Sequence, residues 1–217
     1  MTVVLKLFKE SIARNLRYPT SGPVGWYINK YFFENKTRFY LKEAAVEACN
    51  ISKDDVVLEV GFGPGVGIKE AYTKIKDGNG KIYGVDISHS MIRRASGALQ
   101  PQIQAGKVEL ILADVAKLPF ESDKFDHVYH CNCYYFWDDQ VACAQELHRV
   151  MKPNANMIAA FYEREIKKAS EAGMLKYGNT DPDKYMESLR KAGFQGIELK
   201  KWKNTKGYAF SVIVSHK

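Results

Sequence analysis

The sequence of 217 residues predicts an α/β fold in which helices cover both faces of a doubly wound, mostly parallel sheet. Two observations carry this expectation. From Asp55 onward, short apolar runs of strand length alternate with segments of helical periodicity, as in right-handed βαβ units. The last two strand-like runs are joined only by residues 203–207, which cannot hold a crossover helix. The sheet is therefore expected to end in an antiparallel hairpin.

Seven strands are expected, each an apolar or β-rich run bounded by turn residues. They lie at 56–60, 81–86, 108–113, 125–132, 156–162, 196–202 and 208–215. Helices are expected at 68–76, from His89 after a capping Ser88, at 138–151 and at 182–192. Near the start, two prolines and a glycine within 18–23 separate one helix from the next. We expect a single domain over 1–217, with N-terminal cover helices at 1–50 and the sheet core at 51–217.

The composition is that of an ordinary globular protein, with 46% hydrophobic and 26% charged residues. No apolar run is long enough to cross a bilayer, and the start of the chain lacks the pattern of a secretory signal. Four cysteines without small-scaffold spacing indicate reduced thiols. We expect a cytoplasmic location, although basic residues between Lys6 and Arg17 leave a mitochondrial presequence open. The net charge of +7 would suit a nucleic-acid or membrane-surface partner, but much of it is thinly spread.

Glycines and carboxylates stand where the predicted parallel strands end, and ligands bind at these ends in open α/β sheets. The first strand runs into Gly61-Phe62-Gly63-Pro64-Gly65, a loop whose glycines let the backbone approach a ligand closely. The second strand ends at Asp86, placed to accept hydrogen bonds from two ribose hydroxyls. The third ends at Asp114, which can accept from an adenine amine.

Apolar and charged neighbours complete this expected nucleoside site. Ile87, Met91 and Val115 are placed to sandwich an adenine ring. Glu59 adds negative charge beside the glycine loop, where an ammonium or sulfonium group would be welcome. The loop lacks the Gly-Lys-Ser/Thr ending of a phosphate-binding P-loop, and Val66 stands where the dinucleotide fingerprint needs its third glycine. The expected ligand is therefore an adenosine that carries positive charge and no phosphate.

Five segments in register resemble the class I S-adenosylmethionine-dependent methyltransferases. The segment 57–65, Val-Leu-Glu-Val-Gly-Phe-Gly-Pro-Gly, resembles motif I of that family, and the similarity continues through 85–88, 113–120, 125–129 and 147–154. Asn154 and Ala155 replace two glycines that the family usually has. The resemblance implies a Rossmann-like sheet and S-adenosyl-L-methionine as cofactor. It is nearest to the small-molecule branch, similar to ubiquinone/menaquinone-biosynthesis-type methyltransferases, and so implies transfer of a methyl group to a small-molecule acceptor by in-line displacement.

The resemblance also implies roles for individual positions. The three loop glycines would approach the methionine portion, Asp86 would hold the ribose, and Asp114 with Val115 would meet the adenine. Cys131 and Asn132, after the fourth strand, would line the methionine and methyl side. The candidate cofactor-binding residues are Glu59, Gly61, Phe62, Gly63, Gly65, Asp86, Ile87, Met91, Asp114, Val115, Cys131 and Asn132.

Aromatic residues crowd the N-terminal segment and the stretch after the fourth strand. Candidates for the wall of a substrate pocket are Tyr18, Trp26, Tyr27, Tyr134 and Trp137, although ordinary packing of the cover helices explains them equally well. His130 and Tyr135 are candidate general bases for the acceptor. Strand alternation leaves open whether His130 faces the core instead.

The predicted fold would also suit three other functions. A nucleic-acid or protein methyltransferase would fit the basic pI near 9.1, but Cys131-Asn132-Cys133-Tyr134 is not the Asp/Asn-Pro-Pro-aromatic motif that holds a flipped base. A nicotinamide dehydrogenase is disfavoured by the missing third glycine. A cofactor-binding pseudoenzyme stays open. No metal site is expected, because the pair Cys131 and Cys133 lacks the spacing of a zinc site. The sequence does not predict the oligomeric state.

Overall fold

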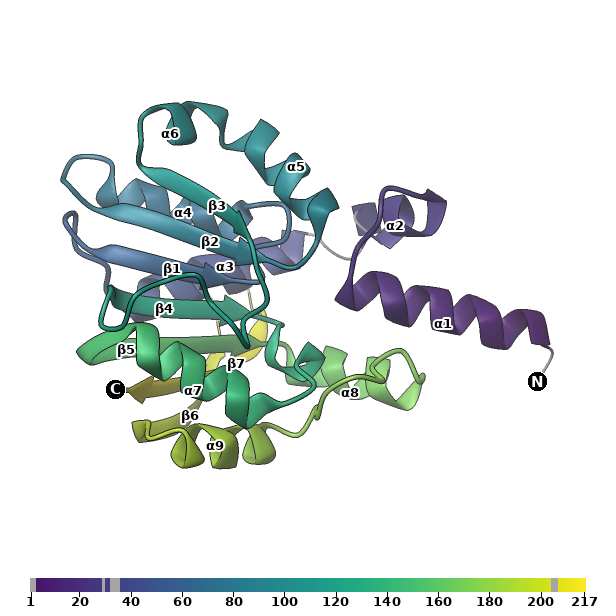
Figure 1. Ribbon diagram of the computed structural model, residues 1–217. Coiled ribbons are helices and arrows are strands. Elements are labelled where there is room, and N and C mark those ends of the chain that lie inside the picture. Colours follow the sequence, from purple (N-terminus) through teal and green to yellow (C-terminus); the bar gives the residue numbers. More distant parts are fainter. Residues whose placement is uncertain (1–2, 29, 32–35, 204–206) are drawn as a thin grey trace.

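The computed structural model describes residues 3–28, 30–31, 36–203 and 207–217, and its centre is a twisted sheet (Figure 1). Within the described residues the sheet has seven strands in the order β3-β2-β1-β4-β5-β7-β6. Their bounds are β1 Val56–Val60, β2 Lys81–Asp86, β3 Val108–Leu112, β4 Phe125–Cys131, β5 Met151–Phe161, β6 Gln195–Lys203 and β7 Ala209–His216. The first five pair in parallel, whereas β7 is antiparallel to both β5 and β6. The predicted fold class is confirmed, including the closing antiparallel hairpin.

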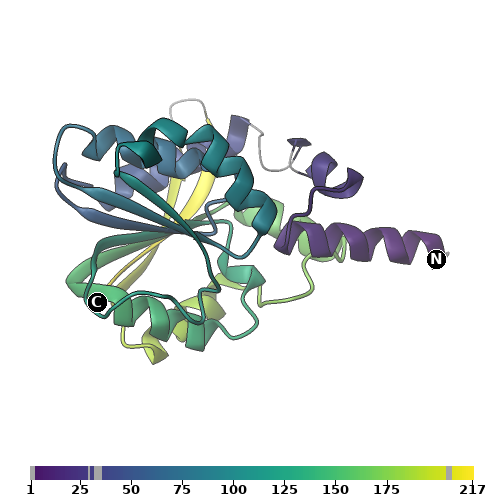
Figure 2. The same ribbon diagram turned by 45° about the horizontal axis from the view of Figure 1, so that its top comes forward.

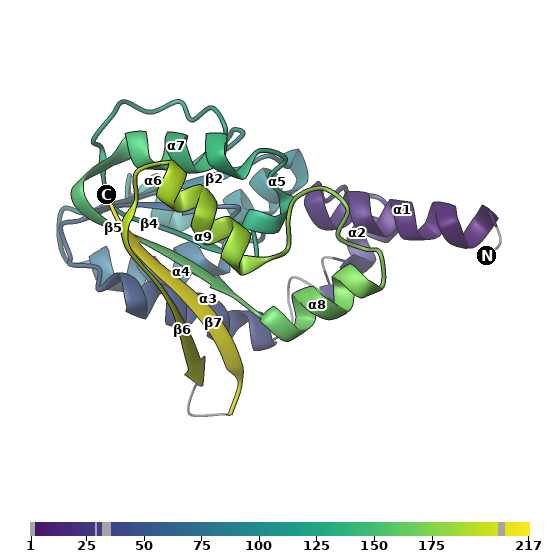
Figure 3. The same cartoon turned by 90° about the horizontal axis from the view of Figure 1, so that it is seen from below.

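Helices cover both faces of the sheet because neighbouring strand residues point to opposite sides. Val57 and Leu58 are both fully buried, yet they belong to separate hydrophobic clusters. On the side of Val57 lie α3 (Lys36–Cys49), α4 (Val66–Ile75) and α5 (His89–Ala98). On the side of Leu58 lie α7 (Gln140–Val150) and α9 (Pro182–Lys191), which pack together (Figure 3). This is the doubly wound arrangement.

The N-terminal helices divide into two groups that the sequence did not separate. Helix α3 buries Leu41, Ala45 and Cys49 against the sheet and so belongs to one of its two helical layers, although we expected it in the cover. Helices α1 (Val3–Arg17) and α2 (Pro23–Ile28) instead lie beyond the carboxyl ends of the central strands. Figures 1 and 2 show α1 extending away from the sheet toward its N-terminus. These two helices are the observed cover.

Three short elements were not predicted, since none has a long apolar stripe. Helix α6 (Gln100–Gln104) has only five residues, and α8 (Glu163–Glu171) buries only Ile166. A 3-10 turn, η2 (Tyr134–Phe136), follows β4. Strand β5 also begins earlier than expected, at Met151. Pro153 does not precede the strand but lies within it, where the pairing between β4 and β5 shifts its register. The link between β6 and β7 includes residues 204–206, which lie outside the described residues.

Among the helices of the described residues, none combines the length and the apolar character that a bilayer-crossing segment needs.

Candidate functional site

A cavity of about 540 Å³ opens at the carboxyl ends of the central strands, the position expected for a ligand in this fold. Ten of the twelve candidate cofactor residues line it. These are Gly61, Phe62, Gly63, Asp86, Ile87, Met91, Asp114, Val115, Cys131 and Asn132. The side chains or backbone of four separate strand ends therefore converge on one space. Such convergence is what a bound nucleoside requires.

The glycine loop after β1 can take its shape only with residues that tolerate a left-handed backbone. Gly61 has φ 65° and its N–H donates to the carbonyl of Val85 at 2.8 Å, which ties the loop to β2. A Cβ at Gly61 would lie 2.6 Å from the Cys133 sulfur, so no larger residue fits. Gly63 has φ 58°, but a Cβ there would meet no atom within 4 Å. The loop therefore presents bare backbone to the open cavity at Gly63.

Asp86 is the best-organised acceptor of the site. Its Oδ2 accepts from the N–H of Gly63 at 3.0 Å, and its Oδ1 accepts from the N–H of Ser88 at 2.9 Å. Burial raises the pKa of Asp86, and these two hydrogen bonds and the nearby Lys42 oppose that rise. A carboxylate oxygen has two lone pairs, so each oxygen keeps one for a donor in the cavity. This arrangement fits a pair of ribose hydroxyls.

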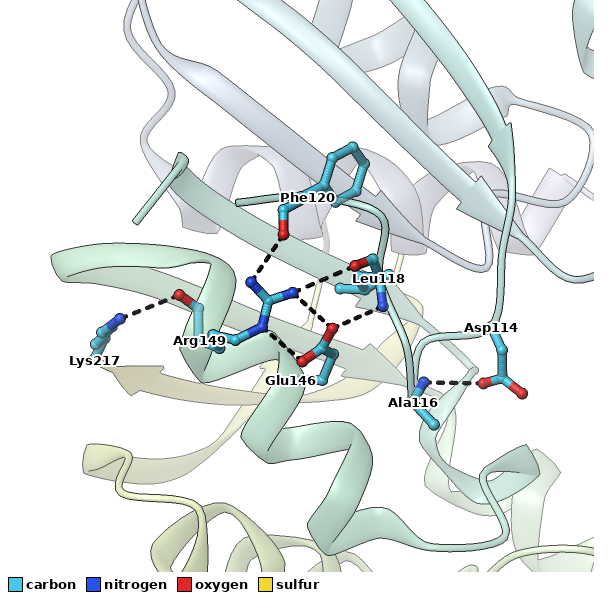
Figure 4. Close-up of polar contacts among 7 residues, drawn as sticks. All are labelled: Asp114, Ala116, Leu118, Phe120, Glu146, Arg149 and Lys217. Atoms are coloured by element: carbon cyan, nitrogen blue, oxygen red, sulfur yellow. Dashed lines mark hydrogen bonds and ion pairs between the residues drawn. The ribbon is translucent and has the colours of Figure 1, made fainter. Parts of the chain in front are cut away.

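The loop that follows Asp114 and Val115 is held against α7 by an ion pair. Figure 4 shows that Asp114 accepts from the N–H of Ala116. It also shows Arg149 bonded to backbone carbonyls farther along the same loop. Arg149 donates to the carbonyl of Phe120 at 2.8 Å and to both carboxylate oxygens of Glu146, at 2.8 and 2.7 Å. Glu146 in turn accepts from the N–H of Leu118 at 2.8 Å. The segment carrying Asp114 is thus braced against α7.

The two candidate cofactor residues outside the cavity lining are Glu59 and Gly65. Gly65 precedes α4, and a Cβ there would meet Leu99 at 2.9 Å, so it packs against α5. Glu59 is fully buried and forms an ion pair with Lys42 of α3. Its other oxygen accepts from the hydroxyl of Tyr129 at 3.0 Å. The expectation that Glu59 offers free negative charge to a ligand was therefore wrong. The negative charge of Glu59 is paired with Lys42, and Lys42 is the residue of this pair that lines the cavity.

Neither candidate base lies in the cavity. His130 is fully buried, and its Nε2 is 2.8 Å from the hydroxyl of Tyr185. Burial, together with the charge of Lys42, lowers the pKa of His130 to about 3. Tyr135 is also buried and does not line the cavity. His130 faces the packed core, the alternative that strand alternation left open, so the structure corrects both base assignments.

Of the five aromatic pocket candidates, only Trp137 lines the cavity. Tyr134 is buried, and its hydroxyl donates to the carbonyl of Thr180 at 3.0 Å. Tyr18 is half-buried outside the lining, and Trp26 and Tyr27 are exposed. These four residues were wrongly placed, since aromatic content does not reveal which face of a helix meets a cavity.

The cavity lining also includes residues outside the candidate set. Leu16, Arg17 and Pro19 come from the cover, and Phe39 comes from α3. Arg17 forms an ion pair with Asp138, which follows η2, and its guanidinium lies 4.6 Å from the ring centre of Tyr177. Partners this far apart in sequence leave no local pattern to detect.

The cover is also fastened at the nucleoside end. The hydroxyls of Ser88 and Ser90, at the start of α5, both donate to the carbonyl of Pro19, at 2.7 and 2.5 Å. Arg93 donates to the hydroxyl of Ser21 at 3.0 Å. Among the described residues, no group of three histidine, cysteine or acidic side chains could hold a metal ion.

A parallel sheet with a closing hairpin, a glycine loop and strand-end carboxylates defines a nucleoside-binding α/β protein. Residues 57–154 match the family described as "Methyltransferase domain". The chain is 28% identical over 173 residues to the "Uncharacterized methyltransferase YdaC" of Bacillus subtilis, covering 80% of this chain and 87% of that protein. It is also 28% identical over 143 residues to a "2-phytyl-1,4-naphtoquinone methyltransferase" of Trichormus variabilis, covering 66% of this chain and 62% of that enzyme.

A solved structure shares the fold. The crystal structure of a SAM-dependent methyltransferase from Aquifex aeolicus superposes with a TM-score of 0.66 at 18% identity, covering 88% of this chain and 97% of that one. Together these matches support a class I S-adenosylmethionine-dependent methyltransferase with S-adenosyl-L-methionine as its cofactor.

Proposed function

We propose that this enzyme methylates a small-molecule acceptor, held in the same cavity as the methyl donor. The observation that carries the proposal is the continuity of that cavity, which reaches from Gly63 and Asp86 to Leu16, Arg17 and Trp137. Its lining beyond the nucleoside positions is mainly apolar and aromatic, which suits an acceptor with an apolar body. The naphthoquinone methyltransferase among the relatives supports an acceptor of this kind.

In this proposal Asp86 binds the ribose hydroxyls with the two lone pairs that its backbone contacts leave free. Asp114 accepts from the adenine amine, and Ile87, Met91 and Val115 contact the ring. Gly61 and Gly63 allow the methionine portion to lie against bare backbone, and Cys131 and Asn132 line the side of the methyl group. Gly65 and Glu59 act on the loop from outside the cavity.

S-adenosylmethionine supplies an electrophilic methyl on a sulfonium, which the acceptor takes by in-line displacement while S-adenosylhomocysteine leaves with the C–S electron pair. The protein holds acceptor and methyl carbon in line, and such positioning contributes about 7–11 kcal/mol to catalysis. With His130 and Tyr135 outside the cavity lining, our candidate to accept a proton from the acceptor is Asp138, which lines the cavity. Cover and core both line the cavity, which supports one functional domain over 1–217.

Incubation with isotope-labelled S-adenosylmethionine and a panel of hydroxyquinones, phenols and amines tests the proposal. Label transferred to a small molecule, and lost with Asp86→Ala, is the expected result. Label that enters RNA or protein in a steeply salt-dependent reaction would support the alternative of a macromolecular acceptor. Tight cofactor binding without transfer to any acceptor class would support a pseudoenzyme.

A further inference from the structure

The cover exposes an unusual amount of apolar surface. Ten large apolar side chains of the described residues are exposed, and six of them lie between Leu7 and Phe39. Five of these six are more than half exposed and occupy α1, α2 and the residues just after α2. They are Leu7, Phe8, Trp26, Tyr27 and Tyr31, and we call this set the N-terminal apolar surface. Exposed apolar residues gathered in this way indicate an interaction site.

Basic side chains accompany this surface. Lys6, Arg14 and Lys30 are exposed, and the ammonium of Lys30 lies 4.9 Å from the ring centre of Trp26. Within the described part of α1 and α2 and residues 30–31, Glu10 is the only carboxylate. Arg17, the remaining arginine, is already paired with Asp138. The partner of this surface must therefore accept both apolar insertion and positive charge.

The position of α1 also favours a flat, extended partner. Figures 1 and 3 show the N-terminal half of α1 projecting beyond the body of the protein. Leu7 and Phe8 belong to this half of the helix and are both exposed. Phe8, Ile12 and Leu16 follow one another at intervals of four residues, which places them on one stripe of the helix. Leu16 lines the cavity, so this stripe leads from the exposed tip to the site.

We propose that α1 and α2 dock on a bilayer surface containing anionic lipids. Tryptophan and tyrosine prefer the headgroup level of a membrane, and an amphipathic helix with basic residues lies in that plane. A second copy of the chain fits less well, because a two-fold contact sets each patch against itself. Lys6, Arg14 and Lys30 would then face their own copies, with Glu10 as the sole described carboxylate nearby.

Co-sedimentation of the full chain with vesicles tests this inference without any methyl transfer. Binding is expected to phosphatidylcholine vesicles that contain phosphatidylserine, and not to phosphatidylcholine alone. Leu7→Ser with Phe8→Ser should lower the partition coefficient about ten-fold or more, because two apolar side chains no longer insert. Lys6→Glu with Arg14→Glu should lower it about 25-fold or more, since each of the two basic residues near an anionic surface contributes roughly five-fold.

Matched controls lie elsewhere on the surface. Leu112→Ser removes another exposed apolar side chain, and Lys200→Glu with Lys203→Glu makes the same charge change on β6. Both controls should bind vesicles as the parent does. None of the four substituted cover residues lines the cavity, so calorimetry with S-adenosylhomocysteine should give the parent affinity and show that they are folded.

Three results would overturn the inference. One is the absence of binding to anionic vesicles. Another is binding that the charge variant loses and the Leu7/Phe8 variant keeps, which would indicate a polyanion rather than a bilayer. The third is a dimer in sedimentation velocity that the Leu7/Phe8 variant abolishes, which would assign the surface to a second copy.

Discussion

Lys42 on α3 and Glu59 on β1 form an ion pair whose carboxylate is fully buried and whose ammonium lines the cavity. Burial raises the pKa of Glu59, and the charge of Lys42 opposes that rise. Glu59 also crowds Gly67, where a Cβ would lie 2.5 Å from its oxygens. The pair therefore lies at the end of β1 and close against the first turn of α4, where only glycine leaves room for it.

Replacing Lys42 with methionine should cost about 3–5 kcal/mol of unfolding free energy at neutral pH, because a buried carboxylate loses its counter-charge. The added substitution Glu59→Gln should restore most of that loss. Lys53→Met, at an exposed position, is the matched control and should change little. Urea unfolding measures all four proteins. Equal stability of the Lys42→Met variant and the parent would show that the pair does not hold the fold.

The loss caused by Lys42→Met should depend on pH. Lys42 is the cation that offsets the burial of Glu59 among the described residues, so without it the folded-state pKa of Glu59 rises further above the unfolded value of about 4.3. An acid with a raised folded pKa binds protons more tightly when folded, and its penalty appears as pH rises from that unfolded value through the folded pKa. The variant's deficit should therefore shrink toward pH 4 and grow toward neutrality. A constant deficit would contradict this account.

Asp86→Ala should weaken S-adenosylhomocysteine binding about 100-fold or more. Two charge-assisted hydrogen bonds to the ribose are lost, and the N–H of Gly63 loses its acceptor. Titration calorimetry gives the affinity, and thermal unfolding without ligand reports the fold. Asp77→Ala, at an exposed turn, should bind as the parent does. Unchanged affinity in Asp86→Ala would remove this residue from the site.

His130 should act through stability and not through catalysis. Its folded pKa of about 3 lies below the unfolded value near 6.5, so the unfolded chain binds the proton first as pH falls. Its stabilising effect is complete above that unfolded value and is lost toward pH 3, by about 1.4 kcal/mol per pH unit. His130→Asn should flatten this dependence in urea unfolding at pH 7 and pH 5. A large fall in turnover with unchanged stability would restore the catalytic role.

Arg149→Met should loosen the segment that carries Asp114. Removal of hydrogen bonds to Glu146 and to the carbonyl of Phe120 should cost about 1–2 kcal/mol of stability, since the guanidinium is partly exposed. Cofactor affinity should fall several-fold, because Val115 contacts the cavity. Lys152→Met breaks a similar pair with Asp126 away from the cavity lining and should leave affinity unchanged. Equal cofactor affinities in the two variants would show that the Arg149 ion pair does not influence the cofactor site.

The position of the cavity at the strand ends could be predicted because its signals are local. Gly61, Asp86 and Asp114 each follow a recognisable strand, and parallel strands bring their carboxyl ends together. The closing hairpin followed from the length of its connection, whereas the order of the strands was not predicted. The same reasoning placed ten of twelve candidate cofactor residues on the cavity.

The rest depended on pairings that have no local pattern. Lys42 neutralises a glutamate on another element, and Arg17 meets Asp138 across 121 positions of sequence. His130 and Tyr134 are the sequence neighbours of cavity-lining residues, but their own side chains point into the core. A shift of one position along the chain decides between these two orientations. The aromatic content of a segment does not indicate which way each side chain faces. Trp26 is exposed to solvent, whereas Trp137 lines the cavity.

The carbonyl of Pro19 accepts from both serines at the start of α5, two and four residues after Asp86. The cover thus contacts the residues that follow the strand end of Asp86 through this one carbonyl oxygen. We therefore expect donor binding and acceptor binding to be coupled through this contact. If the bound methyl donor raises the affinity for the acceptor by some factor, the bound acceptor must raise the affinity for the donor by the same factor.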